Sequence, residues 1–186
     1  MDTLNVGLAS WIIQDRNYED FEAGKNYCFA LQYYAPQPLE RAKLGSRMIK
    51  LASAYRYDVC GQVLYFTDEV CVIDFGIRAY AEEPKQVVEV GEWLRGRIHL
   101  GIDEFSYFET FKNYPRMPNL FYRFHVGSIL LETTPWIRNK YPQYPNYKER
   151  DQTKEGFVAV ARTDAFKDDD GNADYILQCQ LIEDAR

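Results

Sequence analysis

Long apolar runs are missing from this sequence of 186 residues. No stretch approaches the roughly 20 consecutive apolar residues that a membrane-spanning helix needs, so we expect no membrane partner. The first residues, MDTLNVGLAS, lack the basic segment and the apolar core of a secretory signal peptide. We therefore expect a cytoplasmic protein.

The motifs of the common enzyme classes are missing too. The sequence contains no GxSxG nucleophile elbow, HExxH zinc site, phosphate-binding loop or GxGxxG dinucleotide fingerprint. Histidine, the most frequent acid–base catalyst, occurs only as His99 and His125, and nothing in the sequence brings the two together. These absences favour a protein without catalytic activity and predict no cofactor.

The sequence also lacks the residue spacings that are typical of metal sites. Four cysteines lie singly inside apolar-rich runs, without a C-x-x-C pair: Cys28, Cys60, Cys71 and Cys179. This pattern is typical of buried free thiols in a reducing compartment. In the acidic tract DDDGNAD, Gly171 is misplaced for a calcium-binding EF-hand loop, and a cysteine stands where the closing glutamate belongs. We predict no metal site.

Basic residues are fewer than acidic residues, whereas aromatic residues are abundant. The net charge of −6 and the pI of about 5.0 do not fit the basic excess of a typical nucleic-acid-binding protein, and an acidic chain suits a basic protein partner. Aromatic residues make up 16% of the chain, with 15 Tyr and 11 Phe. Aromatic side chains favour β-sheets, and an excess of Tyr is typical of recognition surfaces.

Three runs alternate between apolar and polar side chains, which is the pattern of half-buried strands. They span 55–66, 70–80 and 93–103, and we expect them to pair as an antiparallel meander. Alternate side chains of a strand point to the same face, so the apolar residues of the three strands gather on one side of the sheet. The opposite side collects the polar residues Gln62, Asp74, Arg78, Arg95, Arg97 and His99.

After Asp103 the spacing between apolar residues changes from two positions to three or four. Aromatic residues recur at this helical spacing: Phe105, Tyr107, Phe108 and Phe111. Asp103 stands where the N-cap belongs and Glu104 falls in the first turn, where carboxylates stabilise the free amides of a helix. We therefore interpret these two carboxylates as helix-capping groups rather than a catalytic pair.

The remaining segments add strands and one further short helix. We expect a pair of strands at 4–13 and 27–34, a short helix within 38–52, a long strand at 120–131, and a closing hairpin of 157–163 with 175–182. Together these elements predict a single mainly β domain over residues 1–186. Its architecture is an antiparallel barrel or a two-sheet sandwich with one or two short helices.

The order of elements over residues 55–132 resembles the oligonucleotide/oligosaccharide-binding (OB) barrel. Three strands, a helix and a further strand follow one another as they do in that fold. The resemblance is one of element order without signature residues, so it bears on the fold rather than on the ligand.

One candidate binding surface lies on the polar side of the predicted meander. Trp93, Arg95, Arg97 and His99 project from one strand at period two, beside Asp74 of the neighbouring strand. A tryptophan among cationic groups can hold an anionic or aromatic ligand. The alternative is a solvated sheet face on which Asp74 pairs with one of the arginines.

A second candidate is the segment IRNKYPQYPNYKER, residues 137–150. Tyr141, Tyr144 and Tyr147 recur every third residue between prolines, so a polyproline II helix would align their rings. The flanking basic residues outnumber the single glutamate. Such a segment can bind single-stranded nucleic acid or an acidic protein surface, or it can pack on the barrel as a stiff crossover.

The sequence thus favours a non-catalytic cytoplasmic binding protein that engages another macromolecule, above all a protein, through aromatic and charged surface. A protein of the inhibitor or immunity type, which masks a basic toxin, has these features. The alternative is an OB-like protein that binds single-stranded nucleic acid. A second alternative is a small hydrolase or isomerase, which requires Asp74, His99 and Arg97 to converge around a pocket.

Overall fold

Strands make up 53% of the structure and helices 11%, which confirms the mainly β prediction. This computed structural model describes residues 3–43, 45–138 and 148–184. The strands are β1 (Leu4–Ala9), β2 (Lys25–Tyr34), β3 (Glu40–Ala42), β4 (Met48–Ser53), β5 (Arg56–Phe66), β6 (Val70–Asp74), β7 (Arg78–Glu82), β8 (Trp93–Ile102), β9 (Phe121–Glu132), β10 (Trp136–Arg138), β11 (Lys148–Arg150), β12 (Phe157–Val160) and β13 (Asp174–Asp184). The helical segments are α1 (Ser10–Gln14), α2 (Ser106–Glu109), η1 (Phe111–Asn113), η2 (Gln152–Lys154) and η3 (Asp168–Gly171).

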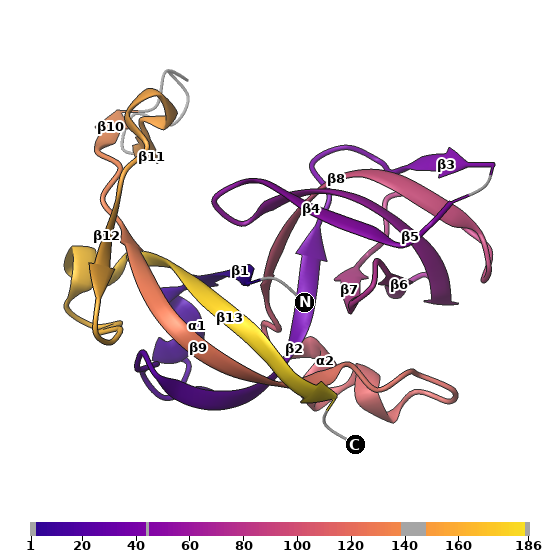
Figure 1. The fold of residues 1–186 in the computed structure, drawn as a ribbon, viewed down its shortest axis with the longest axis horizontal. Helices are drawn as coiled ribbons and strands as arrows, with labels where there is room; N and C mark the ends of the chain where they lie inside the picture. The colour runs from indigo at the N-terminus through magenta and orange to yellow at the C-terminus, as the bar shows by residue number, and fades with distance from the viewer. Residues whose placement is uncertain (1–2, 44, 139–147, 185–186) are drawn as a thin grey trace.

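Eight of the strands form a closed barrel (Figure 1). Around the ring, β9, β13, β1, β8, β5, β6, β7 and β2 follow one another, and the pairing of β2 with β9 closes it. The C-terminal end of β2 also pairs directly with β8. Most pairings are antiparallel, whereas β1–β8 and β2–β7 are parallel. Of the two architectures predicted from sequence, a barrel or a two-sheet sandwich, the structure has the barrel, but its eight strands differ from the five of an OB barrel.

The predicted strand 70–80 is wrong, because the chain reverses within it. Gly76 has a φ of 103°, which favours glycine, and its amide donates to the Asp74 carboxylate at 2.9 Å. β6 and β7 therefore form a hairpin, and β5 lies between β6 and β8. The predicted order of the meander is wrong, yet its parity is confirmed, since Tyr57 of β5 lies opposite Ile98 of β8 and both are buried.

The chain ends also pair differently from the prediction. β1 is followed by α1 and pairs with β13 and β8 rather than with β2. The segment 38–52 contains β3 and β4 instead of a helix. The closing hairpin does not form, since β12 and β13 both pair with β9. The long strand predicted at 120–131 is confirmed as β9.

Two apolar clusters fill the structure. The larger lies inside the barrel and includes the fully buried Phe29, Ile98 and Phe124. The smaller lies where α2 and η1 cover the outer face of β6 and β7, and it contains Tyr80 and Tyr107. Of the free cysteines, Cys71 and Cys179 are buried, Cys60 is half-buried and Cys28 is exposed, so the prediction of buried thiols fails for Cys28.

Asp103 is fully buried and holds the start of the helix. Its carboxylate accepts the amides of Tyr107 at 3.1 Å and Phe108 at 3.0 Å, and the Tyr80 hydroxyl donates to it at 2.5 Å. Burial raises the pKa of this carboxyl, while these donors oppose the rise. The capping role is confirmed, although the N-cap position itself is Phe105.

The helix is shorter than the aromatic spacing suggested. Because α2 covers only Ser106–Glu109, Phe108 turns outward and is 49% exposed, whereas Phe105 and Phe111 are buried. Glu104 precedes the helix, so its predicted place in the first turn is wrong.

We expect Asp103→Ala to lower the free energy of unfolding by about 2–4 kcal/mol, because three buried donors lose their acceptor. Chemical denaturation measures this change. Asp103→Asn keeps a carbonyl oxygen and should lose less, and Glu109→Gln on the exposed side of α2 is the control. Equal stability of Asp103→Ala and the wild type would show that the carboxylate does not hold the helix.

Candidate binding cleft

A cleft of about 720 Å³ opens on the barrel where β1, β2 and β8 meet. Its lining comes from these three strands, from α1, β6, β7, the loops after β2 and β7, and the first residues of β13. Many of the lining residues are apolar, among them Leu8, Leu39 and Ile102. Ligand-binding clefts have volumes of about 300–1,000 Å³, so this cleft is large enough for a ligand or a peptide segment.

Two glycines of the cleft lining lie opposite each other. Gly7 of β1 pairs with Gly101 of β8, and both line the cleft. A Cβ at Gly7 would lie 3.2 Å from the ring of Tyr55, so glycine lets this ring rest on β1. At Gly101 the nearest atom to a Cβ is the Gly7 carbonyl oxygen at 3.4 Å. A Cβ at position 101 would therefore contact only this one atom within 4 Å.

Three rings form an aromatic wall beside these glycines. His99 lies between Tyr34 and Tyr55, with ring centroids 6.0 Å and 5.6 Å away, both in edge-to-face geometry. The strand register explains this, because Tyr34 of β2 and Arg56 of β5 flank His99 on either side. Tyr34 is 56% exposed and so presents its ring to solvent.

His99 is held in its neutral form. Partial burial lowers the pKa of its imidazole, and the guanidinium of Arg56 lowers it further. Since the ordinary pKa of histidine is about 6.5, the neutral form of the ring predominates at pH 7. His99 thus acts in the cleft as an aromatic and hydrogen-bonding group.

Acidic side chains line the cleft near the end of β8. Gln32 connects two of them, since it accepts the backbone amide of Glu104 at 3.1 Å and donates to the Glu82 carboxylate at 3.3 Å. Burial raises the pKa of Glu104, and the nearby charges of Glu82 and Asp103 raise it further. The two glutamates therefore repel each other within the cleft.

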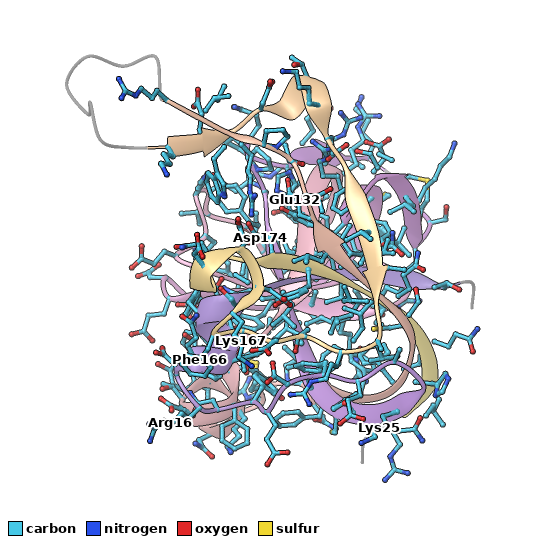
Figure 2. All side chains as sticks on the ribbon, turned by 90° about the vertical axis from the view of Figure 1, so that its left-hand side faces the viewer. Arg16, Lys25, Glu132, Phe166, Lys167 and Asp174 are labelled. Atoms are coloured by element: carbon cyan, nitrogen blue, oxygen red, sulfur yellow. The ribbon has the colours of Figure 1, made fainter. Side chains whose placement is uncertain are left out.

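Asp174 contributes a further carboxylate where β13 begins. Figure 2 shows Asp174 close to Glu132. Burial is the main cause of the raised pKa of Asp174, and Glu132 adds to it, although Arg150 lies 3.7 Å away. Negative charge is therefore crowded at this end of the cleft as well.

The lining as a whole is anionic. Among the described lining residues, the acidic ones are Glu82, Glu83, Glu104 and Asp174, and the only permanent cation is Lys85. The Lys85 ammonium lies 4.6 Å from the centre of the Tyr34 ring and donates to the Ala35 carbonyl at 3.2 Å. Within residues 3–43, 45–138 and 148–184, no group of three His, Cys, Asp or Glu side chains could hold a metal ion.

Of the residues predicted on the sheet face, only His99 lines the cleft. Arg95 pairs with Glu40 at 3.0 Å and Arg97 with Asp58 at 2.9 Å, so both arginines have acidic partners. The side chain of Trp93 lies against the chain at Gly45, where a Cβ would be 2.4 Å from the indole.

Asp74 pairs with Arg47 at 2.7 Å rather than with an arginine of β8. It lies opposite Gln62, which in turn lies opposite the first residue of β8. His99 is six residues further along, on the order of 20 Å away. The catalytic arrangement of Asp74, His99 and Arg97 therefore does not form.

The predicted tyrosines Tyr141, Tyr144 and Tyr147 lie outside the described residues. The strands that flank them, β10 and β11, pair and stand away from the barrel (Figure 1). Arg150 anchors this pair, because it stacks 3.9 Å from the centre of the Trp136 ring and binds Asp169 at 2.7 Å. The Trp136 indole donates to the same carboxylate at 2.7 Å.

Sequence reasoning missed most of the cleft. Tyr34, Tyr55, Gly7 and Gly101 come from segments far apart in the chain. The usable signal was the glycines, since a glycine inside a strand pattern indicates a close backbone approach.

Comparisons with known proteins identify no relative. No protein-family model matches the chain, and no curated protein sequence or solved structure matches it either. Among the described residues, no helix has the length and apolar character needed to cross a membrane.

We expect the imidazole of His99 to titrate below pH 6.5 in an NMR titration, because burial and Arg56 both disfavour its charged form. Arg56→Gln should raise the midpoint only part of the way, since burial is the larger cause. His125→Gln assigns the two imidazole signals. A His99 midpoint above 6.5 would mean that the cleft carboxylates control the ring instead.

Glu104→Gln should raise the Tm at pH 7 slightly, on the order of 1 °C, because it removes a charge that the folded chain disfavours. A carboxyl whose pKa is raised by folding lowers stability above that pKa and ceases to do so as the pH falls through it. The gain measured by calorimetry should therefore shrink toward acidic pH. A gain that persists there would indicate another cause.

Proposed function

We propose that this protein is a non-catalytic binding protein that engages a protein partner through the cleft between β1, β2 and β8. The observation that carries the proposal is an open cleft of about 720 Å³ whose lining combines apolar residues, aromatic rings including the exposed Tyr34, and acidic side chains. Aromatic groups and a few oriented polar groups are characteristic of recognition sites.

Charge supports a basic partner. The chain carries −6 overall, and the cleft lining is itself anionic. Complementary potentials speed association and exclude partners of like charge. An inhibitor or immunity-type protein that masks a basic partner is one form of this function.

The alternative functions have less support. The arginines of β8 are paired with Glu40 and Asp58, and phosphates would have to displace these carboxylates. An acidic cleft also repels a nucleic-acid backbone. The hydrolase or isomerase hypothesis required an Asp74, His99 and Arg97 site, which the strand register disperses.

A cleft-filling variant tests the proposal. Gly101→Leu places a side chain in the cleft, whereas Gly127→Leu places the same side chain on the exposed face of β9, where a Cβ has no neighbour closer than 3.7 Å. We expect tagged wild-type protein and Gly127→Leu to capture the same stoichiometric, nuclease-resistant partner from native lysate. Gly101→Leu should lose it while retaining the wild-type circular dichroism spectrum.

Equal capture of the partner by Gly101→Leu would contradict the use of the cleft. A set of captured proteins that vanishes with nuclease would favour the nucleic-acid alternative instead. Binding of single-stranded oligonucleotide at low salt, measured by fluorescence anisotropy, would then confirm that alternative.

A further inference from the structure

Resting on the function proposed above, we propose that the cleft receives a cationic side chain, the ammonium of a lysine or the guanidinium of an arginine, from an extended segment of the partner protein. The ligand would lie over Gly101, between the aromatic wall and the carboxylates of Glu104 and Asp174. Three observations carry this inference: the rings, the carboxylates and the open floor.

The rings suit a cation. An ammonium or guanidinium group within about 6 Å of an aromatic ring centre is attracted by the negative face of the ring. The chain already makes this contact at the rim of the cleft, where Lys85 lies 4.6 Å from the centre of Tyr34. His99, which lies between the tyrosines, is neutral at pH 7 and does not repel a cation.

Like charges lie near both lining carboxylates, and Arg150 compensates Asp174 only in part. Glu104 faces the like charges of Glu82 and Asp103, and Asp174 faces Glu132. Arg150 lies 3.7 Å from Asp174 but is closer to Asp169, at 2.7 Å. Burial is the main cause of the raised pKa of both carboxyls, and a cation in the cleft would offset both this burial and the repulsion from neighbouring carboxylates.

The shape suits a side chain presented by a segment of chain. The cleft crosses β2, β8 and β1, and its volume of about 720 Å³ exceeds that of one amino-acid side chain. Gly101, which carries no side chain, lets main chain approach β8 closely. We therefore assign the remaining volume to residues that flank the cation.

Short peptides test the inference on the full-length protein. The probe is acetyl-Gly-Gly-Lys-Gly-Gly-amide, and its matched control carries Nε-acetyl-lysine, which has nearly the same shape but no charge. We expect the lysine peptide to shift the backbone amide NMR signals of Gly7, Gly101 and Glu104 in a saturable manner. The acetylated peptide should bind at least about tenfold more weakly.

Charge variants should change this affinity in opposite directions. Glu104→Gln should weaken binding of the lysine peptide about fivefold, and Lys85→Gln should strengthen it about twofold by removing a competing cation. Glu109→Gln changes the net charge equally, lies outside the cleft and should leave the affinity unchanged. Equal binding of both peptides, or signal shifts confined to residues outside the cleft, would overturn the inference.

The two proposals fail separately. If Gly101→Leu loses the partner but no lysine peptide binds, the cleft is the interface and the cationic ligand is wrong. If the peptide binds as expected while Gly101→Leu still captures the partner, the cleft binds cations without serving that interaction. Stronger binding of free butylammonium than of the peptide would point to a small amine rather than a protein segment, and it too would overturn the inference.

Discussion

The barrel and its cleft both depend on β8, which pairs with four other strands. It pairs with β3 at its N-terminal end and with β5 from Trp93 to His99, and its C-terminal end pairs with β2 and β1. Alternate residues of the strand, including Ile98 and Leu100, fill the core. The residues between them form the outer face, where His99 and Gly101 line the cleft. One strand thus fixes the closure of the barrel and the position of the site.

The parity of side chains in the strands could be predicted from the sequence because it is a local property. It placed Tyr57, Val63 and Ile98 in the core, as the structure confirms. Because alternation is only a local property, it did not reveal that the chain reverses between β6 and β7. Ile73 pairs with Ala79, so alternation continues unbroken through the hairpin, and only Gly76 marked the turn. The pairings of β1 with β13 and of β12 with β9 could not be predicted from the local sequence pattern, because they depend on the whole fold.

The candidate site was predicted only in part, and the part that failed is informative. His99 stood out as a polar residue on a strand, and it does line the cleft. The neighbouring arginines stood out equally, but acidic residues from β3 and β5 neutralise them. Glu104 was interpreted as a helix-capping residue, whereas the structure leaves it before α2, with its amide on Gln32. Sequence pattern locates charges on a face, and only the fold determines which of them have partners.

The central claim is that the partner contacts the protein at the cleft, and site-specific photo-crosslinking in cells tests it most directly. A photoreactive phenylalanine analogue would replace Tyr34 at the cleft, with Val158 on β12 as a control position of similar exposure. Mass spectrometry of the crosslinked peptides should identify one partner at position 34, through a lysine- or arginine-containing segment, and not at position 158. Crosslinks of equal yield and identity at both positions, or none at position 34, would contradict the claim.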